Sequence, residues 1–272
     1  MPHDVHPVML VYRTDIIESL GIDVNELDTW EKFCEVGRRV TKDIDGDGLI
    51  DRYMLQLDSE GRDFLLMMAM QRGAEVFDKN GNVAMDSQIF ADTVYWYIMQ
   101  CRGPGRISFD PDTGQTLYKS ILDGLVLFYP TADHNTKMYE MDLPSLAGKM
   151  KIMPLPAWEK GGRRSTTVGG TGLAITKACK KKDLAWDFAE FLYYKNPTLS
   201  FEYINVIPPL VDSWDDPIFE ESNSYYSGQR IGQIFIKAAK QTPDNYVTAY
   251  TFVAMEKLTE AYLDCALYYD RN

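Results

Sequence analysis

Short apolar segments alternate with longer amphipathic segments along this 272-residue chain, and this alternation limits the possible folds more than any other feature. The apolar segments are bounded by turn-forming residues and have the composition of buried strands. The predicted strands are residues 8–12, 53–57, 125–129 and 173–176. The predicted helices are residues 15–20, 29–40, 64–71, 87–100, 116–123 and 183–194, with a mainly helical region from residue 217 onward. Strands that alternate with helices predict an α/β protein.

The helix predicted at residues 29–40 shows how these segments are expected to pack. Thr29 has the side chain of an N-cap. Trp30, Phe33 and Gly37 recur at helical spacing, so they fall on one face that is expected to be buried.

The net charge excludes several classes of partner. The chain has 40 acidic and 28 basic residues, a formal charge of −12. A surface of that sign repels phosphate backbones and anionic lipids, so no nucleic-acid or membrane-surface partner is expected. The one basic cluster, residues 177–182, is predicted to be a solvated loop. No apolar run approaches the roughly 18 residues that a membrane span needs.

The N-terminal residues and the cysteines leave the cellular compartment open. Residues 1–7 lack a basic region followed by an apolar core, so they are not read as a signal peptide. That reading fits a cytoplasmic protein or an exported one whose leader has been removed. The cysteines lack zinc-ligand spacing and are expected to be reduced, mostly buried thiols, although disulfides stay open. They are Cys34, Cys101, Cys179 and Cys265.

An acidic loop at residues 43–51 matches most of an EF-hand-type calcium loop. Carboxylates recur at alternate positions, and Gly48 stands where such a loop needs its glycine. Oxygen ligands in a flexible ring suit Ca²⁺ better than Mg²⁺ or a transition metal. The expected ligands are Asp43, Asp45, Asp47, Leu49 through its carbonyl, and Asp51.

The loop departs from that pattern at its last position. Met54 stands where an EF-hand has its bidentate glutamate, so we expect a structural rather than a sensing calcium site. The alternative is a solvated Asp-Gly turn that binds no ion. A catalytic metal is not expected, because no histidine lies near this loop in the sequence.

Three groups of residues, taken in order, resemble the family 1 extracellular solute-binding proteins of ABC transporters. The first resembles the family's LYYNKDLFEKAGL…TWEE signature, the second its strand before a ligand-contacting loop, and the third its return segment. They are LVYRTDIIESLGID at residues 10–23 with DTWE at 28–31, DGLVLFY at 123–129, and PLP at 154–156 with GGTGLAIT at 169–176 and DLAWDFAEFL at 183–192. The resemblance covers nearly the whole chain.

The resemblance implies a periplasmic-binding-protein-like class II fold, in which two α/β lobes clasp a solute. Family members are longer before the first signature, so this chain resembles lobe two plus the returning segments of lobe one. The implied division is a lobe-two α/β domain at residues 1–167, a return segment of lobe one at 168–212, and a helical part at 213–272 that packs back on lobe two. Leu184, Phe188, Phe191 and Leu192 would face inward, and without lobe one they would need another cover.

The resemblance also implies where a sugar would be contacted. His6 falls where the family places a polar contact on its first crossing strand, and His134 falls where a family member has a stacking tryptophan. Ordinary surface histidines are the alternative for both. The full set of expected ligand-binding residues is Asp4, His6, Arg72, Gly73, Tyr129, Asp133, His134, Trp158, Gly170 and Thr171.

The function implied by the resemblance is capture of a sugar or oligosaccharide and its delivery to ABC permease subunits, without catalysis. The parent chain would be extracytoplasmic, in the periplasm or as a cell-surface lipoprotein. One alternative is a carbohydrate-active hydrolase with a carboxylate pair such as Asp123 and Asp133. Against an enzyme, the sequence contains no GxSxG, HExxH or phosphate-binding glycine loop. A calcium-stabilised interaction module is a further alternative.

Overall fold

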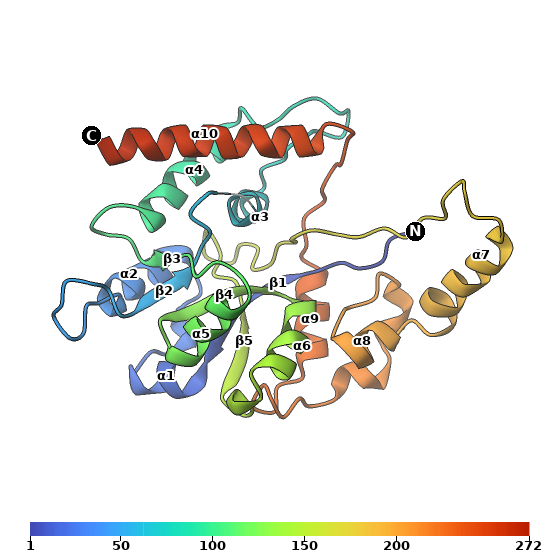
Figure 1. Ribbon diagram of the computed structural model, residues 1–272, viewed down its shortest axis with the longest axis horizontal. Helices are drawn as coiled ribbons and strands as arrows, with labels where there is room; N and C mark the ends of the chain where they lie inside the picture. The colour runs from blue at the N-terminus through green and yellow to red at the C-terminus, as the bar shows by residue number, and fades with distance from the viewer. Residues whose placement is uncertain (62, 272) are drawn as a thin grey trace.

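A five-stranded mixed sheet forms the centre of the molecule in the computed structural model, which describes residues 1–61 and 63–271 (Figure 1). The strand order is β3-β2-β4-β1-β5. β2 pairs in parallel with β3 and β4, whereas β1 is antiparallel to both of its neighbours, β4 and β5. The strands are β1 (Val8–Arg13), β2 (Tyr53–Gln56), β3 (Ser108–Phe109), β4 (Val126–Ala132) and β5 (Met150–Pro154).

Helices cover both faces of this sheet (Figure 1). Alternate residues of β1 point to opposite faces, so Val8 and Leu10 join one apolar cluster and Met9 and Val11 join another. The first cluster includes side chains of α2, α3, α4 and α10, and the second includes side chains of α5, α6 and α9. The helices are α1 (Thr14–Ser19), α2 (Trp30–Val40), α3 (Asp63–Arg72), α4 (Gln88–Cys101), α5 (Gln115–Asp123), α6 (Asp133–Asp142), α7 (Lys182–Glu190), α8 (Leu199–Ile204), α9 (Ile231–Ala239) and α10 (Thr251–Arg271).

The α/β prediction is therefore confirmed, and helix α2 follows its prediction closely. Thr29 accepts a hydrogen bond from the backbone N–H of Lys32, and Trp30, Phe33 and Gly37 are buried. The indole N–H of Trp30 donates to Gln71 Oε1 at 2.9 Å. Gln71 in turn donates to the carbonyls of Pro156 and Arg163, so one buried amide joins α2, α3 and the loop after β5.

The strand predicted at residues 173–176 is wrong. This segment is largely exposed; Leu173 N–H donates to Met1 O, and the preceding Gly172 forms an isolated bridge with Pro2. A strand needs a neighbour that pairs along its length. The apolar composition of the segment was therefore not sufficient to make it one.

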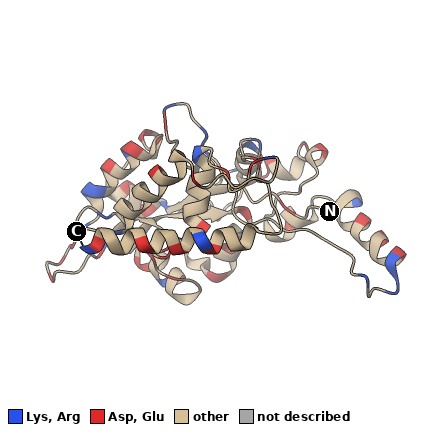
Figure 2. Ribbon diagram, turned by 90° about the horizontal axis from the view of Figure 1, so that it is seen from above, with Lys and Arg blue, Asp and Glu red and all other residues tan. Residues whose placement is uncertain are grey.

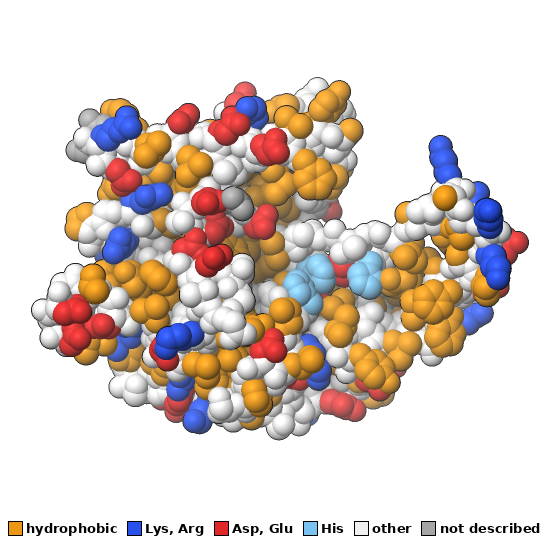
Figure 3. All heavy atoms as spheres, in the orientation of Figure 1, with side chains coloured by type: hydrophobic (Ala, Val, Ile, Leu, Met, Phe, Trp, Pro, Cys, Tyr) orange, Lys and Arg blue, Asp and Glu red, His pale blue; other side chains and the backbone are white. Residues whose placement is uncertain are grey.

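Helix α7 forms where it was predicted, but its apolar face is exposed. The helix projects on an arm away from the sheet, and apolar side chains gather on this arm (Figures 1 and 3). Leu184 and Phe188 are each 61% exposed, and Trp186 is 53% exposed. The expected inward packing of Leu184, Phe188 and Phe191 is thus not seen, because no described element lies against this face. This exposed apolar face agrees with the expectation that another protein surface packs against α7.

The placement of the charged residues agrees with the sequence prediction, and that of the cysteines agrees in part. Acidic and basic residues of the described chain are spread over the surface, and the basic residues 177–182 form the exposed turn leading into α7 (Figure 2). The four cysteines are free, as expected, but only Cys34 is fully buried and Cys265 is exposed. Burial raises the pKa of both Cys34 and Cys101 to about 12. Among the described residues, no helix combines the length and the apolarity needed to cross a membrane.

The division into residues 1–167, 168–212 and 213–272 stays a prediction. Within the last part, α9 packs beside β1 and α10 packs against α4, so both helices return to the sheet and its covering helices.

Gly232 in α9 allows a close approach to the segment before it. A Cβ at Gly232 would lie 2.8 Å from both the Cα and the carbonyl oxygen of Phe219.

We predict that Gly232→Ala lowers the free energy of unfolding by about 1–3 kcal/mol, because the added methyl group meets backbone atoms that cannot move aside. This loss exceeds the ~1 kcal/mol that alanine gains over glycine in a helix. Urea denaturation measures the change. Gly105→Ala is the matched control, since nothing lies within 4 Å of its added Cβ. Equal stability of Gly232→Ala and the unsubstituted protein would contradict the tight contact.

Candidate functional site

A cavity of about 1150 Å³ opens at the edge of the sheet where the parallel strands β2, β3 and β4 end. In open α/β sheets, ligands bind outside the carboxyl ends of strands. Gln56 and Asp58 reach the cavity from the end of β2, Asp110 from the end of β3, and His134 from just after β4. Residues 168–171 close another side of it.

The register of β1 on β4 brings two histidines to this edge. Val8 pairs with Ala132 in an antiparallel ladder, so the residues that precede β1 lie beside those that follow β4. His6 is two residues before Val8, and His134 is two residues after Ala132. Their rings lie edge to face with centroids 4.6 Å apart. With His3, they form a group of imidazoles on one face of the molecule (Figure 3).

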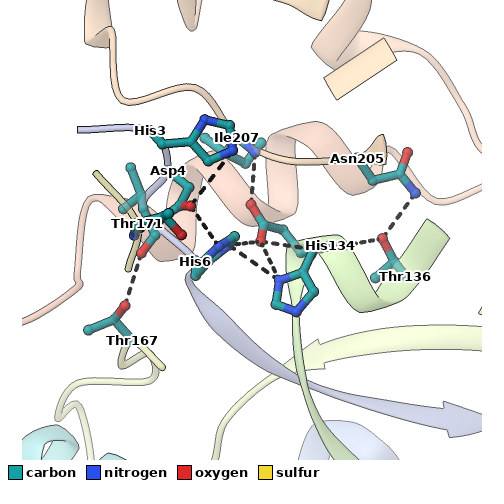
Figure 4. Close-up of polar contacts among 11 residues, drawn as sticks. His3, Asp4, His6, His134, Thr136, Thr167, Thr171, Asn205 and Ile207 are labelled. Carbon is teal, nitrogen blue, oxygen red and sulfur yellow. Dashed lines mark hydrogen bonds and ion pairs between the residues drawn. The ribbon is translucent and has the colours of Figure 1, made fainter. Parts of the chain in front are cut away.

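His6 lies between two buried carboxylates (Figure 4). Its Nδ1 is 2.6 Å from Asp133 Oδ1, and its Nε2 is 3.0 Å from Asp4 Oδ2. The side chains of Asp4 and Asp133 are 1% and 0% exposed. No lysine or arginine of the described chain forms an ion pair with either carboxylate, so imidazoles face their charges.

The charged state of this pair follows from its surroundings. Burial lowers the pKa of His6 and is the largest single influence, but hydrogen bonds and charge attraction from Asp133 and Asp4 together outweigh it and raise that pKa above its usual value. Burial likewise raises the pKa of Asp133, yet its hydrogen bonds with His134 and His6 leave it lowered. Both shifts favour the charged forms, an imidazolium at His6 and a carboxylate at Asp133.

Backbone groups fix the two carboxylates in place. Asp133 Oδ2 accepts a hydrogen bond from the N–H of Ile207 at 2.8 Å, and its Oδ1 accepts one from the N–H of His134. Asp4 Oδ1 accepts from the N–H of Thr171 at 2.9 Å. The pair of aspartates therefore joins the chain before β1, the start of α6, the segment at 171 and the segment at 207 (Figure 4).

The backbone of His6 supports this view of a constrained position. Its φ of +45° lies in the left-handed region, which non-glycine residues seldom adopt. Residues hold such conformations when the surroundings determine them, and they gather at functional sites. At the other end of the group, His3 Nδ1 contacts the hydroxyl of Tyr193.

Six of the expected ligand-binding residues lie together in this region. His6, His134, Gly170 and Thr171 line the cavity. Asp4 and Asp133 lie directly behind them and hold His6 and Thr171.

The other four lie elsewhere, and none of them lines the cavity in the described part of the chain. Tyr129 is 2% exposed in the core, and its hydroxyl is bonded to Ser120. Trp158 packs against the indoles of Trp30 and Trp96. Arg72 lies over the ring of Trp158, with its Cζ 4.9 Å from the ring centroid, and Gly73 follows it. Trp158 thus has the packing of a loop anchor.

Sequence reasoning missed most of the cavity wall. Several of the missed residues follow the parallel strands β2 and β3. The end of the strand predicted at 53–57 could have identified those after β2, but β3 is a two-residue strand that was not predicted. Further missed residues come from the ends of α3, α5 and α6. They include Gln56, Asp58, Asp63, Phe64, Asp110, Asp112, Tyr118, Asn135, Met138 and Tyr139.

The carboxylates of the hydrolase alternative are not a pair. Asp123 ends α5, is exposed and pairs with Lys119, whereas Asp133 is buried beyond the other end of β4. A seven-residue strand separates them by roughly 23 Å. Glycosidase carboxylates lie about 5–10 Å apart, so these two cannot act on one glycosidic bond.

The acidic loop forms a separate cluster on the surface. Ligand oxygens of Asp43, Asp45 and Asp51 lie within 4.8 Å of one another, and Asp47 is outside this group. Backbone N–H groups of the loop also donate to these carboxylates; Gly46 N–H, for example, lies 2.6 Å from Asp43 Oδ1. Met54, which replaces the EF-hand glutamate, is buried in β2.

Comparison with known proteins connects this architecture to one family. Residues 1–194 match the family described as bacterial extracellular solute-binding protein. The chain is 28% identical to an arabinooligosaccharide-binding protein of Halalkalibacterium halodurans over 97% of its length and 60% of the relative. It is 24% identical to an arabinooligosaccharide-binding protein of Bacillus subtilis over 81% of its length and 51% of the relative. It therefore spans between half and three fifths of these relatives.

Solved structures show the same fold. An ABC-transporter-associated binding protein from B. animalis subsp. lactis, in complex with β-1,6-galactobiose, superposes with a TM-score of 0.75 at 18% identity, covering 96% of this chain and 65% of that one. Maltose-bound MalE3 of T. maritima superposes with a TM-score of 0.68 at 17% identity, covering 97% and 68%. The predicted periplasmic-binding-protein-like fold is confirmed.

We predict that Asp133→Ala lowers the free energy of unfolding by about 3–5 kcal/mol, because it removes the nearer of the two carboxylates that face His6 and leaves the Ile207 N–H buried without its acceptor. Asp123→Ala is the matched control. It removes an exposed pair, so a change below about 1 kcal/mol is expected. Chemical denaturation followed by circular dichroism measures both. Similar small losses in the two variants would show that the Asp133 network does not hold this region together.

Proposed function

This chain belongs to the bacterial extracellular solute-binding protein family, and we propose that the native protein captures a neutral oligosaccharide and delivers it to the permease of an ABC importer. The observation that carries this proposal is the cavity at the carboxyl ends of β2, β3 and β4. The relatives named as arabinooligosaccharide-binding proteins support an oligosaccharide as the solute. The protein would act by binding alone, without chemistry on the solute.

The lining of the cavity suits a sugar. A sugar presents hydroxyls that need fixed hydrogen-bonding groups and C–H faces that pack on aromatic and apolar side chains. His134, Gln56 and Asn135 offer the former, while Phe64 and Tyr118 offer the latter. The volume exceeds the roughly 300–1,000 Å³ of ordinary small-molecule pockets, which favours an oligosaccharide over a monosaccharide.

The charge of the lining favours a neutral solute. Asp63, Asp110 and Asp112 are among its carboxylates, and the described lining residues include no lysine or arginine. An acidic sugar would bring its own negative charge next to these groups, and like charges disfavour binding. Neutral sugars offer hydroxyl donors that carboxylates accept directly.

Membership of an extracellular family supports an extracytoplasmic location, and the native chain would be periplasmic or a cell-surface lipoprotein. The partners would be the membrane-spanning permease subunits of the importer.

We also propose that the acidic loop binds one structural Ca²⁺ through Asp43, Asp45, Asp51 and oxygens of Asp47 and Leu49. The convergence of three carboxylates supports it, because like charges held together repel unless a cation lies between them. The loop is far along the chain from the cavity residues around β4, and the ion would stabilise the fold rather than contact the solute.

We predict that the native chain binds one of a panel of neutral oligosaccharides, including arabino-oligosaccharides, β-1,6-galactobiose and maltotriose, with a Kd of micromolar order or tighter. His134→Ala should weaken that binding at least about tenfold, or ~1.4 kcal/mol, because it removes a polar contact from the cavity wall. Isothermal titration calorimetry in EDTA measures the affinity.

Met141→Ala is the matched control, because Met141 is exposed on the same helix and does not line the cavity. Its affinity should equal that of the unsubstituted protein. Binding of acidic oligosaccharides only, or of no sugar in the panel, would contradict the proposed solute class.

For the acidic loop, we predict that Ca²⁺ at 100 times its Kd stabilises the native chain by about 2.7 kcal/mol and raises Tm by about 5–10 °C. Asp45→Asn should abolish the shift, whereas Asp86→Asn, at another exposed acidic position, should retain it. Differential scanning fluorimetry with and without EDTA makes the measurement. A calcium shift that survives Asp45→Asn would place the ion elsewhere.

A further inference from the structure

We propose that His6, Asp133 and His134 form a binding site for one divalent transition-metal ion, with Zn²⁺ as the ion best suited to their donor atoms. The three side chains converge on one point beside the cavity, with two imidazole nitrogens and one carboxylate oxygen as ligands. This site is separate from the acidic loop, both in position and in chemistry. Two of its ligands, His6 and His134, also line the solute cavity, so metal binding is measured without a sugar.

The spacing of the donor atoms fits a metal of this size. His6 Nδ1 and His134 Nδ1 are 3.4 Å apart, and His134 Nδ1 and Asp133 Oδ1 are 3.7 Å apart. Zinc–ligand bonds of about 2.0–2.1 Å in tetrahedral geometry place ligand atoms roughly 3.3 Å from one another. The third separation, 2.6 Å between His6 Nδ1 and Asp133 Oδ1, is a hydrogen bond. It would open by roughly 0.7 Å when the ion replaces the shared proton.

Groups that could orient the ligands of such an ion lie next to them. Metal-binding histidines commonly donate their other ring N–H to a carboxylate, which fixes the tautomer and orients the ring. Asp4 Oδ2 lies 3.0 Å from His6 Nε2 and makes no standard hydrogen bond with the described residues. With its proton on Nε2, on the side of Asp4, His6 would keep the lone pair of Nδ1 for the metal. Asp133 is fixed in the same way, since its other oxygen accepts from Ile207 N–H.

The charges of the site also favour a divalent cation. Asp4 and Asp133 place two carboxylates in a buried position, and among the described residues their ion-pair partners are all imidazoles. One imidazolium compensates one of these charges. A divalent ion with two neutral histidines compensates both, which outweighs the unfavourable positive end of the α6 dipole.

The donor set selects the kind of metal. Imidazole nitrogens suit Zn²⁺, Cu²⁺, Ni²⁺ and Fe²⁺, whereas Ca²⁺ and Mg²⁺ prefer oxygen ligands such as those of the acidic loop. Three protein ligands leave a fourth position of a tetrahedral ion open. His6 and His134 both line the cavity, so that position would face the cavity.

The test is calorimetric titration of Zn²⁺ into tag-free native chain that has been stripped with EDTA and exchanged into chelator-free buffer. One Zn²⁺ per chain is expected, and Co²⁺ in its place should give the visible absorption bands of a nitrogen- and oxygen-ligated ion. His134→Ala should abolish both signals. Because His134 is 39% exposed, this variant should keep its fold, which circular dichroism checks.

Two further variants separate ligation from general effects. Asp4→Asn should weaken Zn²⁺ binding about 10- to 100-fold, because it removes the carboxylate charge beside the Nε2 of His6. His3→Ala is the matched control, because His3 belongs to the same group of imidazoles but is not one of the three ligands; its Zn²⁺ affinity should match that of the unsubstituted protein. Absence of Zn²⁺ binding, or equal binding by His134→Ala, would overturn the proposal. Either result leaves the sugar titration, performed in EDTA, unaffected.

Discussion

The antiparallel pairing of β1 with β4 is the constraint on which the rest of the site depends. β1 runs against the parallel strands, so its N-terminal end lies at the edge where β2, β3 and β4 have their carboxyl ends. The pairing of Val8 with Ala132 places the chain before β1 beside the start of α6. A shift of this register by one residue would turn the side chains of β1 to the opposite faces and separate His6 from Asp133.

The buried carboxylates near this edge also hold together segments that are distant in the sequence. Asp4 holds the backbone at Thr171, and Asp133 holds the backbone at Ile207, while both face His6. Each carboxylate therefore uses one oxygen for a backbone N–H and directs the other at an imidazole. These contacts restrain the segments that they join. The cavity wall at His6 and Thr171 is fixed for that reason.

Local features of the sequence were sufficient for most of the secondary structure. Helix α2 followed from its cap and its apolar spacing, because both act within a few residues. The segment at 173–176 failed, because a strand depends on a neighbour that its own composition does not specify. The exposed face of α7 was likewise identified as apolar from the sequence. Its exposure could not be predicted, because the residues of a helix do not specify which elements pack against it.

The site was predictable only in part for the same reason. The family resemblance singled out His6, Asp133 and His134, yet the contact between residues separated by more than a hundred positions arises from the strand register. Trp158 was selected because exposed aromatic rings stack on sugars, but its ring packs against Trp30 and Trp96 instead. The carboxylates after β2 and β3 went unnoticed, because the end of the strand predicted at 53–57 was not considered as a cavity wall and the two-residue strand β3 was not predicted.

The most direct measurement of the central claim is a crystal structure of the native chain with a bound neutral oligosaccharide. We expect the sugar at the carboxyl ends of β2, β3 and β4, in contact with His134 and with the residues that follow β3 (Figures 1 and 3). A sugar bound elsewhere, for example stacked on Trp158 beside Arg72, would contradict the assignment of this cavity as the binding site.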